Sequence, residues 1–109
     1  MSRRLDPVDR VVDAINAGNL DAFVAGYAPR ATIEDGYDTV LASGRDGIRS
    51  RYSTIFAEFP ELRVEPLSRT EVGEFVVQEE RVTGRGDPAR HVAVYLVEDG
   101  LITRERLLA

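Results

Sequence analysis

The chain has 109 residues, a net charge of −5 and no cysteine. This length predicts one domain over residues 1–109, and the 43% hydrophobic content predicts a globular fold with its own core. The missing cysteines exclude disulfides and thiolate metal sites. All 14 basic residues are arginine, which excludes lysine Schiff-base chemistry. The negative net charge argues against a nucleic-acid partner, because phosphate contacts need clustered basic side chains.

The longest apolar run covers residues 92–97, far below the roughly 20 residues that a membrane-spanning helix needs. Arg3 and Arg4 are followed by acidic side chains instead of an apolar stretch, which predicts that no signal peptide is present. We therefore expect no membrane contact and, given the absence of cysteine, a cytoplasmic protein.

The first predicted helix runs from Asp6, its N-cap, to Ala17, with Pro7 in its first turn and Gly18 at its C-terminal end. Its apolar positions recur at helical spacing, at Val8, Val11, Val12 and Ile15. A second helix is predicted after the N-cap Asn19. It runs through Tyr27 and is stopped by Pro29.

Residues 31–35 and 39–41 predict two short strands, and Ser43 opens a third helix that runs to about Glu58. The apolar stripe of this helix comprises Ile48, Tyr52, Ile55, Phe56 and Phe59. Four longer strands follow, at residues 62–70, 74–83, 89–97 and 101–107. Because the strands run together instead of alternating with helices, we predict an α+β fold with a curved antiparallel sheet over three N-terminal helices.

Several segments resemble the ketosteroid isomerases and SnoaL-like polyketide cyclases of the nuclear transport factor 2-like superfamily. The matching segments are residues 16–21, 31–35, 43–44, 47–49 with Tyr52, 83–84 and 98–102. The resemblance covers residues 7–107. It implies a cone-shaped, cystatin-like α+β barrel, a hydrophobic or polyketide-like small-molecule ligand and chemistry without a cofactor. The sequence contains no metal-ligand spacing, which predicts no metal site. A partly apolar outer face of the sheet predicts a homodimer.

The resemblance places Asp35 where the isomerases keep their general-base aspartate. A carboxylate that faces an apolar cavity can move a proton between two carbons of an enolisable ketone. The alternative is that Asp35 only ends a strand and hydrogen-bonds the backbone of its own turn.

The two standard oxyanion donors of the isomerases are absent. Val11 stands where the catalytic tyrosine is expected, and either Val92 or His91 stands where a protonated aspartate is expected. Tyr52 is then the predicted hydroxyl donor, supported by Tyr27. The alternative is that both tyrosines are core aromatics. His91 is either a proton donor or a strand-end histidine.

The strand at residues 74–83 alternates between two faces, and the resemblance turns Gln78, Glu80 and Val82 toward the cavity. Glu80 would form an acid/base pair with Asp35, unless a bulge turns Glu80 to solvent. The full predicted pocket comprises Val11, Phe23, Tyr27, Phe56, Gln78, Glu80, Val82, His91, Val92 and Val94.

Three functions remain open at this point. The first is a cofactor-free isomerase or cyclase with Asp35 as the base and Tyr52 as the donor. The second is a non-catalytic ligand-binding module. The third is a dimeric interaction module that uses the outer face of the sheet. The residues predicted for that face are Phe75, Val77, Ala93, Tyr95 and Val97.

Overall fold

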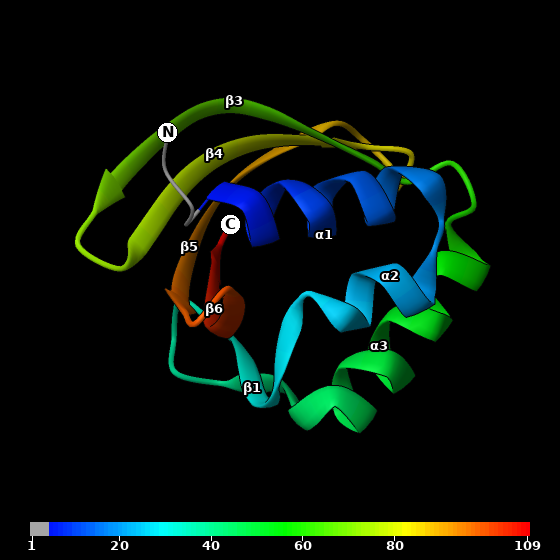
Figure 1. The fold of residues 1–109 in the computed structure, drawn as a ribbon. Coiled ribbons are helices and arrows are strands. Elements are labelled where there is room, and N and C mark those ends of the chain that lie inside the picture. The colour runs from blue at the N-terminus through cyan, green and yellow to red at the C-terminus, as the bar shows by residue number, and fades with distance from the viewer. Residues whose placement is uncertain (1–4) are drawn as a thin grey trace.

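The structure is a computed structural model that describes residues 5–109. Three helices and a two-stranded segment come first, and four long strands follow (Figure 1). The elements are α1 (Leu5–Ala17), α2 (Leu20–Ala25), β1 (Tyr27–Asp35), β2 (Val40–Ser43), α3 (Gly44–Glu58), β3 (Arg63–Val72), β4 (Phe75–Thr83), β5 (Ala89–Glu98) and β6 (Leu101–Leu108). The predicted α+β class with three helices and a curved sheet is confirmed.

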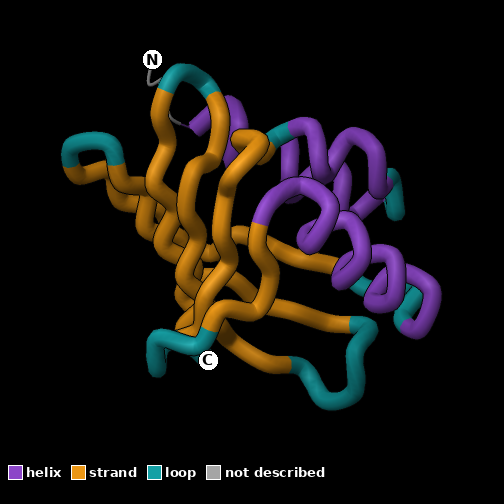
Figure 2. Tube along the Cα trace, turned by 90° about the horizontal axis from the view of Figure 1, so that it is seen from below, coloured by secondary structure: helices purple, strands orange, loops and turns teal. Residues whose placement is uncertain are grey.

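The six strands form one sheet in the order β2-β1-β6-β5-β4-β3. Neighbouring strands are antiparallel except β1 and β6, which run parallel. The prediction of a purely antiparallel sheet was therefore wrong for this one pair. Parallel neighbours need a long crossover, and the chain from β2 through β5 supplies it. Within the described residues β2 and β3 are not paired, so the sheet curves around the helices without closing (Figures 1 and 2).

The first helix begins at Leu5, and the side chain of Asp6, its predicted N-cap, lies outside the described part of the chain, as do Arg3 and Arg4. Val8, Val11 and Val12 are buried as their helical spacing predicts. The helix ends as expected at Gly18, which has a positive φ of 64°.

The second helix is shorter than predicted, because it ends at Ala25 and Tyr27 already belongs to β1. The Gly26 carbonyl accepts a hydrogen bond of 2.9 Å from the Ile102 amide, which draws the chain into the sheet beside β6. A Cβ atom at Gly26 would lie 2.5 Å from Val11 Cγ1, so glycine permits the close approach to α1. This early turn moves Tyr27 from a helix face to the inner face of the sheet.

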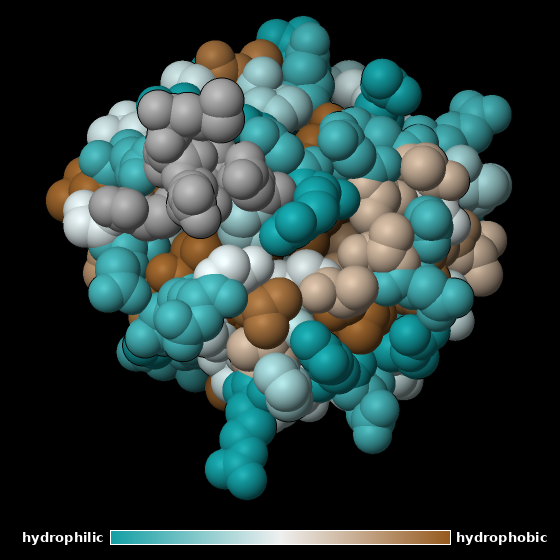
Figure 3. Space-filling model, viewed as in Figure 1, coloured by the Kyte–Doolittle hydropathy of each residue, from teal (hydrophilic) through white to brown (hydrophobic). Residues whose placement is uncertain are grey.

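The core lies between the helices and the concave face of the sheet. It includes Val11 and Phe23 from the helices, Ile33 from β1 and Val76 from β4, all fully buried. The outside is mostly hydrophilic, with small apolar areas separated by charged side chains on the face shown in Figure 3. No helix within residues 5–109 is both long and apolar enough to cross a membrane.

Candidate functional site

Two glutamates face inward from the concave side of the sheet. Glu80 on β4 is 4% exposed and Glu105 on β6 is 3% exposed. Directly opposed residues of antiparallel strands share a face. Glu80 is paired with His91, and Tyr95 is paired with Glu105, so all four belong to the concave face. Of the two alternatives for Glu80, the structure thus shows the inward orientation.

Glu105 was not among the predicted site residues, and a β-bulge explains why. Val97 pairs with Ile102 and Leu96 pairs with Arg104, which leaves Thr103 as an extra residue in β6. Simple alternation would place Glu105 opposite to the buried Ile102. The bulge restores both residues to the inner face, because one extra residue reverses the alternation after it. The burial of two residues three apart in one strand becomes apparent only in the structure, so the sequence alone did not indicate this bulge.

Each glutamate has tyrosine as a hydrogen-bond donor. The Tyr27 hydroxyl donates to Glu105 Oε1. The Tyr95 hydroxyl donates to Glu80 Oε2 across 3.2 Å, and Gln78 Nε2 donates to the same oxygen across 2.6 Å. These contacts satisfy the buried carboxyl groups, as burial of polar atoms requires.

A chain of polar contacts continues from Glu80 to the surface. Gln78 Oε1 accepts a hydrogen bond from Arg69 Nε, and the guanidinium of Arg69 also forms an ion pair with Asp9 on α1. Gln78 is completely buried and, as predicted, points inward, but it acts by holding Glu80. It is not among the residues that line the cavity described below.

The surroundings raise the pKa of both glutamates. Burial is the main cause for Glu105, and the negative charge of Glu80 adds to it, so the pKa of Glu105 rises to about 8 despite the Tyr27 hydrogen bond. Burial also raises the pKa of Glu80, but the hydrogen bonds from Gln78 and Tyr95 and the charge of Arg69 oppose the rise. Near neutral pH Glu105 therefore keeps its proton, while the contacts of Gln78, Tyr95 and Arg69 favour the ionised form of Glu80 against the effect of burial.

These groups surround an internal cavity of about 70 Å³. Its lining residues are Ile15, Tyr27, Tyr52, Ile55, Leu62, Val64, Glu80, Val82, Arg85, His91, Tyr95, Glu105 and Leu107. The volume is far below the 300 to 1,000 Å³ of ordinary ligand pockets, and it has room for only about two water molecules. The cavity therefore suits one end of a ligand.

Tyr52 is buried on α3 and lines this cavity, as do the predicted pocket residues Tyr27, Val82 and His91. Burial and the charge of Glu105 raise the pKa of the Tyr52 hydroxyl. Within residues 5–109 no group hydrogen-bonds this hydroxyl. It is thus a neutral donor that faces the cavity with no acceptor, whereas Tyr27 and Tyr95 are already engaged.

Asp35 lies elsewhere, at the end of β1. Its Oδ1 accepts hydrogen bonds from the backbone amides of Tyr37, across 2.8 Å, and Thr39, across 2.9 Å. These amides lower the pKa of Asp35, with Thr39 the larger cause. The residue borders a surface hollow beside Leu107 and Leu108 and does not line the inner cavity. The structure therefore does not bring Asp35 together with Tyr52, and it shows the turn-capping alternative.

The predicted pocket also needs correction on β5. Val92 and Val94 share the outer face with Glu79 and Val77, their partners on β4, while Ala93, Tyr95 and Val97 are buried on the inner face. The assignment of both sets was therefore reversed, because the register between strands decides the face and is not visible in one strand's pattern.

Val11, Phe23 and Phe56 do not line the cavity either. Val11 and Phe23 are fully buried in the core, and Phe56 packs partly buried against it. The Phe23 ring lies 4.3 Å from that of Tyr52 and 5.1 Å from that of Tyr27, centroid to centroid. This packing holds both tyrosines in place under the cavity.

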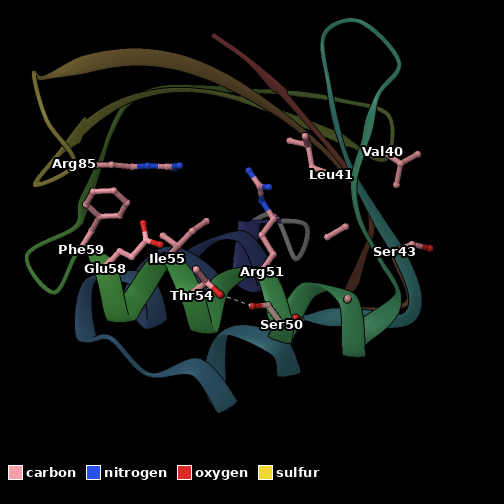
Figure 4. Close-up of a pocket in the computed structure, with 12 residues that line it drawn as sticks. Val40, Leu41, Ser43, Ser50, Arg51, Thr54, Ile55, Glu58, Phe59 and Arg85 are labelled. Atoms are coloured by element: carbon pink, nitrogen blue, oxygen red, sulfur yellow. Dashed lines mark hydrogen bonds between the residues drawn. The ribbon is translucent and has the colours of Figure 1, made fainter.

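A larger open cleft of about 680 Å³ lies between β2, α3 and the β4–β5 turn (Figure 4). Ile55 and Arg85 line both the cleft and the inner cavity. Arg85 follows Gly84, where a Cβ atom would lie 2.0 Å from the Glu61 carbonyl oxygen, so glycine allows this turn to approach the loop between α3 and β3. The positively charged residues of the cleft were not predicted. No group of three or more His, Cys, Asp or Glu side chains in residues 5–109 is arranged to hold a metal ion.

Comparison with known proteins shows a family match and several solved structures with the same fold. Residues 8–105 match the model of the SnoaL-like domain family. A cystatin-fold protein from Novosphingobium aromaticivorans is 27% identical, with a TM-score of 0.91 over 100% of this chain and 99% of that one. A protein named as a polyketide cyclase from Sinorhizobium meliloti is 26% identical, with a TM-score of 0.84 over 94% and 93% of the two chains.

A protein named as a ketosteroid isomerase from Kribbella flavida is 17% identical, with a TM-score of 0.82 over 97% of this chain and 76% of that one. At this identity the likeness supports the fold alone. No curated protein gives a sequence match.

Proposed function

Since this chain belongs to the SnoaL-like domain family, we propose that it binds a small organic molecule and transfers protons on it without a cofactor, as an isomerase or a cyclase. The observation that supports this is the pair of buried carboxyl groups, Glu80 and Glu105, around one cavity. Burial raises the pKa of both groups, and carboxyl groups with raised pKa values that face one cavity are typical of sites that transfer protons.

In this proposal Glu80 is the general base. Its carboxylate removes a proton from the carbon next to a ketone, and burial makes it a stronger base than a carboxylate in water. Glu105 is the general acid and gives its proton to the ketone oxygen as the enol forms. Tyr52 donates a hydrogen bond to the same oxygen, since its hydroxyl has no acceptor within residues 5–109.

The enol can then react in two ways that balance the protons. In the isomerisation of a ketone with a neighbouring carbon–carbon double bond, the enol is a dienol. The protonated Glu80 delivers its proton to the far carbon of the dienol, the double bond shifts into conjugation with the carbonyl, and Glu105 recovers its proton from the enol oxygen. In a cyclisation of the aldol type, the enol carbon attacks a second carbonyl of the same molecule. The new alkoxide takes the proton from Glu80, and Glu105 again recovers its own.

Asp35 is the base that the family resemblance implies, and the proposal replaces it with Glu80. The backbone amides of Tyr37 and Thr39 occupy the Asp35 carboxylate and lower its pKa, which weakens it as a base. Glu80 instead faces the cavity together with Tyr52 and Glu105.

The test is exchange of the protons next to the carbonyl of small ketones in heavy water, followed by NMR. Levulinate and levulinamide are suitable probes. We expect Glu80→Gln and Glu105→Gln to lower the exchange rate by about a hundredfold or more, the usual contribution of a general base or acid. Asp35→Asn serves as the matched control and is expected to retain the rate. Loss of exchange in Asp35→Asn alone would restore Asp35 as the base. Absence of exchange in the wild-type protein would favour a non-catalytic binding module.

The rate should depend on pH with a defined sign. The acid works only while it is protonated, so the rate falls as the pH rises through about 8, the pKa of Glu105. The base works only while it is ionised, so the rate also falls as the pH drops through the raised pKa of Glu80. A rate that increases steadily above pH 8 would contradict the role of Glu105.

We also propose a homodimer formed through the outer face of β4 to β6. Phe75 is 45% exposed there, and with Val94 and Leu96 it borders a hollow of about 150 Å³. An apolar patch with charged residues at its edge, here Arg104 and Arg106, is typical of such interfaces. Light scattering should give a dimer mass for the wild type and a monomer mass for Phe75→Glu. A monomeric wild-type protein would overturn this proposal.

A further inference from the structure

The open cleft next to the inner cavity contains two arginines without acidic partners. Arg51 rises from α3 and Arg85 extends from the β4–β5 turn, so that both guanidinium groups point into the same space (Figure 4). Neither forms an ion pair or a side-chain hydrogen bond within residues 5–109. Other arginines do find carboxylates, as Arg90 does with Glu79 and Arg104 with Glu34.

Arg51 is the more informative of the two. Its Nε atom is buried and has no hydrogen-bond acceptor, the only such side-chain atom among the described residues. A buried donor on a permanently charged group is costly when it has no acceptor, so its presence needs an explanation. An oxygen of a bound anion would provide the missing acceptor.

Arg85 is placed to take part in the same contact. Its guanidinium lies 5.2 Å from the centre of the Phe59 ring, which supports the side chain from one side and leaves the other side open. One acidic residue, Glu58, also lines the cleft, so the lining carries more positive than negative charge. This is unusual in a chain with a net charge of −5.

The charges of the cleft also reach the inner cavity. Arg51 and Arg85 both act to lower the pKa of Tyr52, against the effect of burial. Arg85 and Ile55 line the cleft and the cavity alike. A ligand held by the arginines would therefore extend toward Tyr52, Glu80 and Glu105.

We propose that the cleft is an anion site for an organic acid, in which Arg51 and Arg85 bind the carboxylate of the ligand. The body of the ligand lies in the cleft of about 680 Å³, and an uncharged carbonyl end enters the cavity of about 70 Å³. This inference names the substrate class of the proposed enzyme and so rests on the proposed function. It makes a keto acid the preferred substrate and disfavours a neutral molecule such as a steroid.

The test is the binding of phenylacetate and phenylacetamide, which have the same shape and differ in charge, measured by calorimetry at low and high salt. Charge-assisted hydrogen bonds predict that phenylacetate binds about tenfold or more tightly than the amide. High salt should reduce this preference, because the cleft is open to solvent. Equal binding of the two probes, or no binding of either, would overturn the proposal.

Variants locate the site. Arg51→Gln and Arg85→Gln should each remove most of the preference for phenylacetate. Arg30→Gln removes an exposed arginine of β1 outside the cleft and should leave the preference unchanged. Arg85 lies on an exposed turn, so its variant remains informative if Arg51→Gln does not fold. An unchanged preference in Arg85→Gln, with Arg51→Gln either unchanged or unfolded, would overturn the assignment.

The outcome is separable from that of the proposed function. If phenylacetate binds through the two arginines but levulinate shows no proton exchange, the anion site stands and the proposed catalysis fails. If levulinate and levulinamide exchange at the same rate and the arginine variants do not change either rate, the catalysis stands and the anion site fails.

Discussion

Glu34 and Glu105 lie on neighbouring strands, and both are largely buried, at 8% and 3% exposed. They face opposite sides of the sheet. On the outer side, Arg104 donates two hydrogen bonds to Glu34, of 2.6 and 3.2 Å, and Arg106 donates a third of 3.4 Å. On the inner side, Glu105 receives one hydrogen bond from Tyr27 and no ion pair within residues 5–109.

The two pKa values respond in opposite directions. The Arg104 hydrogen bond is the main cause that lowers the pKa of Glu34. Burial raises the pKa of Glu105 to about 8. Low exposure alone therefore does not decide whether a carboxyl group is protonated. The charged or neutral groups that hydrogen-bond it also set its pKa. Glu34 is fully used by its arginines and serves the sheet, while Glu105 keeps a proton that it can give away.

The largest expected effect comes from removing the charge of Glu105. Its pKa in the folded state exceeds the unfolded value, so its contribution to stability is complete below about pH 4.5 and is lost as the pH rises through about 8. The shift of the Glu105 pKa from 4.5 to about 8 corresponds to at most about 5 kcal/mol in the free energy of unfolding.

Glu105→Gln keeps the shape of the protonated group and cannot ionise. We expect its free energy of unfolding to match the wild type at about pH 4.5 and to exceed it by a few kcal/mol above pH 8, in urea titrations. The matched control is Glu61→Gln on the exposed loop before β3, which should not reproduce this gain in stability. A variant less stable than the wild type at pH 8 would contradict the buried, protonated state.

A smaller effect is expected from Tyr27→Phe, which removes the one donor to Glu105. The hydrogen bond from Tyr27 lowers the pKa of Glu105, so its loss should raise that pKa further and move the decline in stability to higher pH. Loss of one buried hydrogen bond should also cost about 1 kcal/mol at pH 6, where Glu105 is protonated. Tyr37→Phe, on an exposed side chain, is the control. A decline that stays at the wild-type pH would show that Tyr27 does not act on Glu105.

The contrast between these glutamates also marks what the sequence could predict. Alternation placed Glu80 on the same face as Val76 and Val82, and the structure agrees because β4 pairs with β5 without a bulge. Glu105 follows the bulge at Thr103, which depends on how β6 pairs with β5, and no local pattern reveals that pairing.

The same limit applied to the faces of β5, whereas for Asp35 the local sequence was sufficient. The inner position of Tyr95 follows from its pairing with Val76, and a single strand does not contain this information. For Asp35, the turn chemistry of an aspartate followed by glycine predicted the hydrogen bonds that the structure shows, while the family resemblance implied a cavity position. Local chemistry was the better guide there, because it needs no assumption about distant strands.

Glu34→Gln should give the smallest of the three changes in stability, and with the opposite sign to Glu105→Gln. The pKa of Glu34 in the folded state is below the unfolded value. Its contribution is therefore present above the unfolded pKa and lost as the pH falls through the folded one. We expect Glu34→Gln to be less stable than the wild type at neutral pH, and the difference to disappear in acid.

The stability change in Glu34→Gln should be modest because the arginines that bind Glu34 are partly exposed to solvent. The Arg104 side chain is 53% exposed, so solvent screens its charge, and high salt should reduce the loss further. Arg104→Gln in the Glu34→Gln background should then cost little more, because the pair is already broken. If Glu34→Gln instead became more stable than the wild type as the pH rises, as Glu105→Gln should, then burial would outweigh the arginines on both faces of the sheet, and the difference between the two glutamates would not exist.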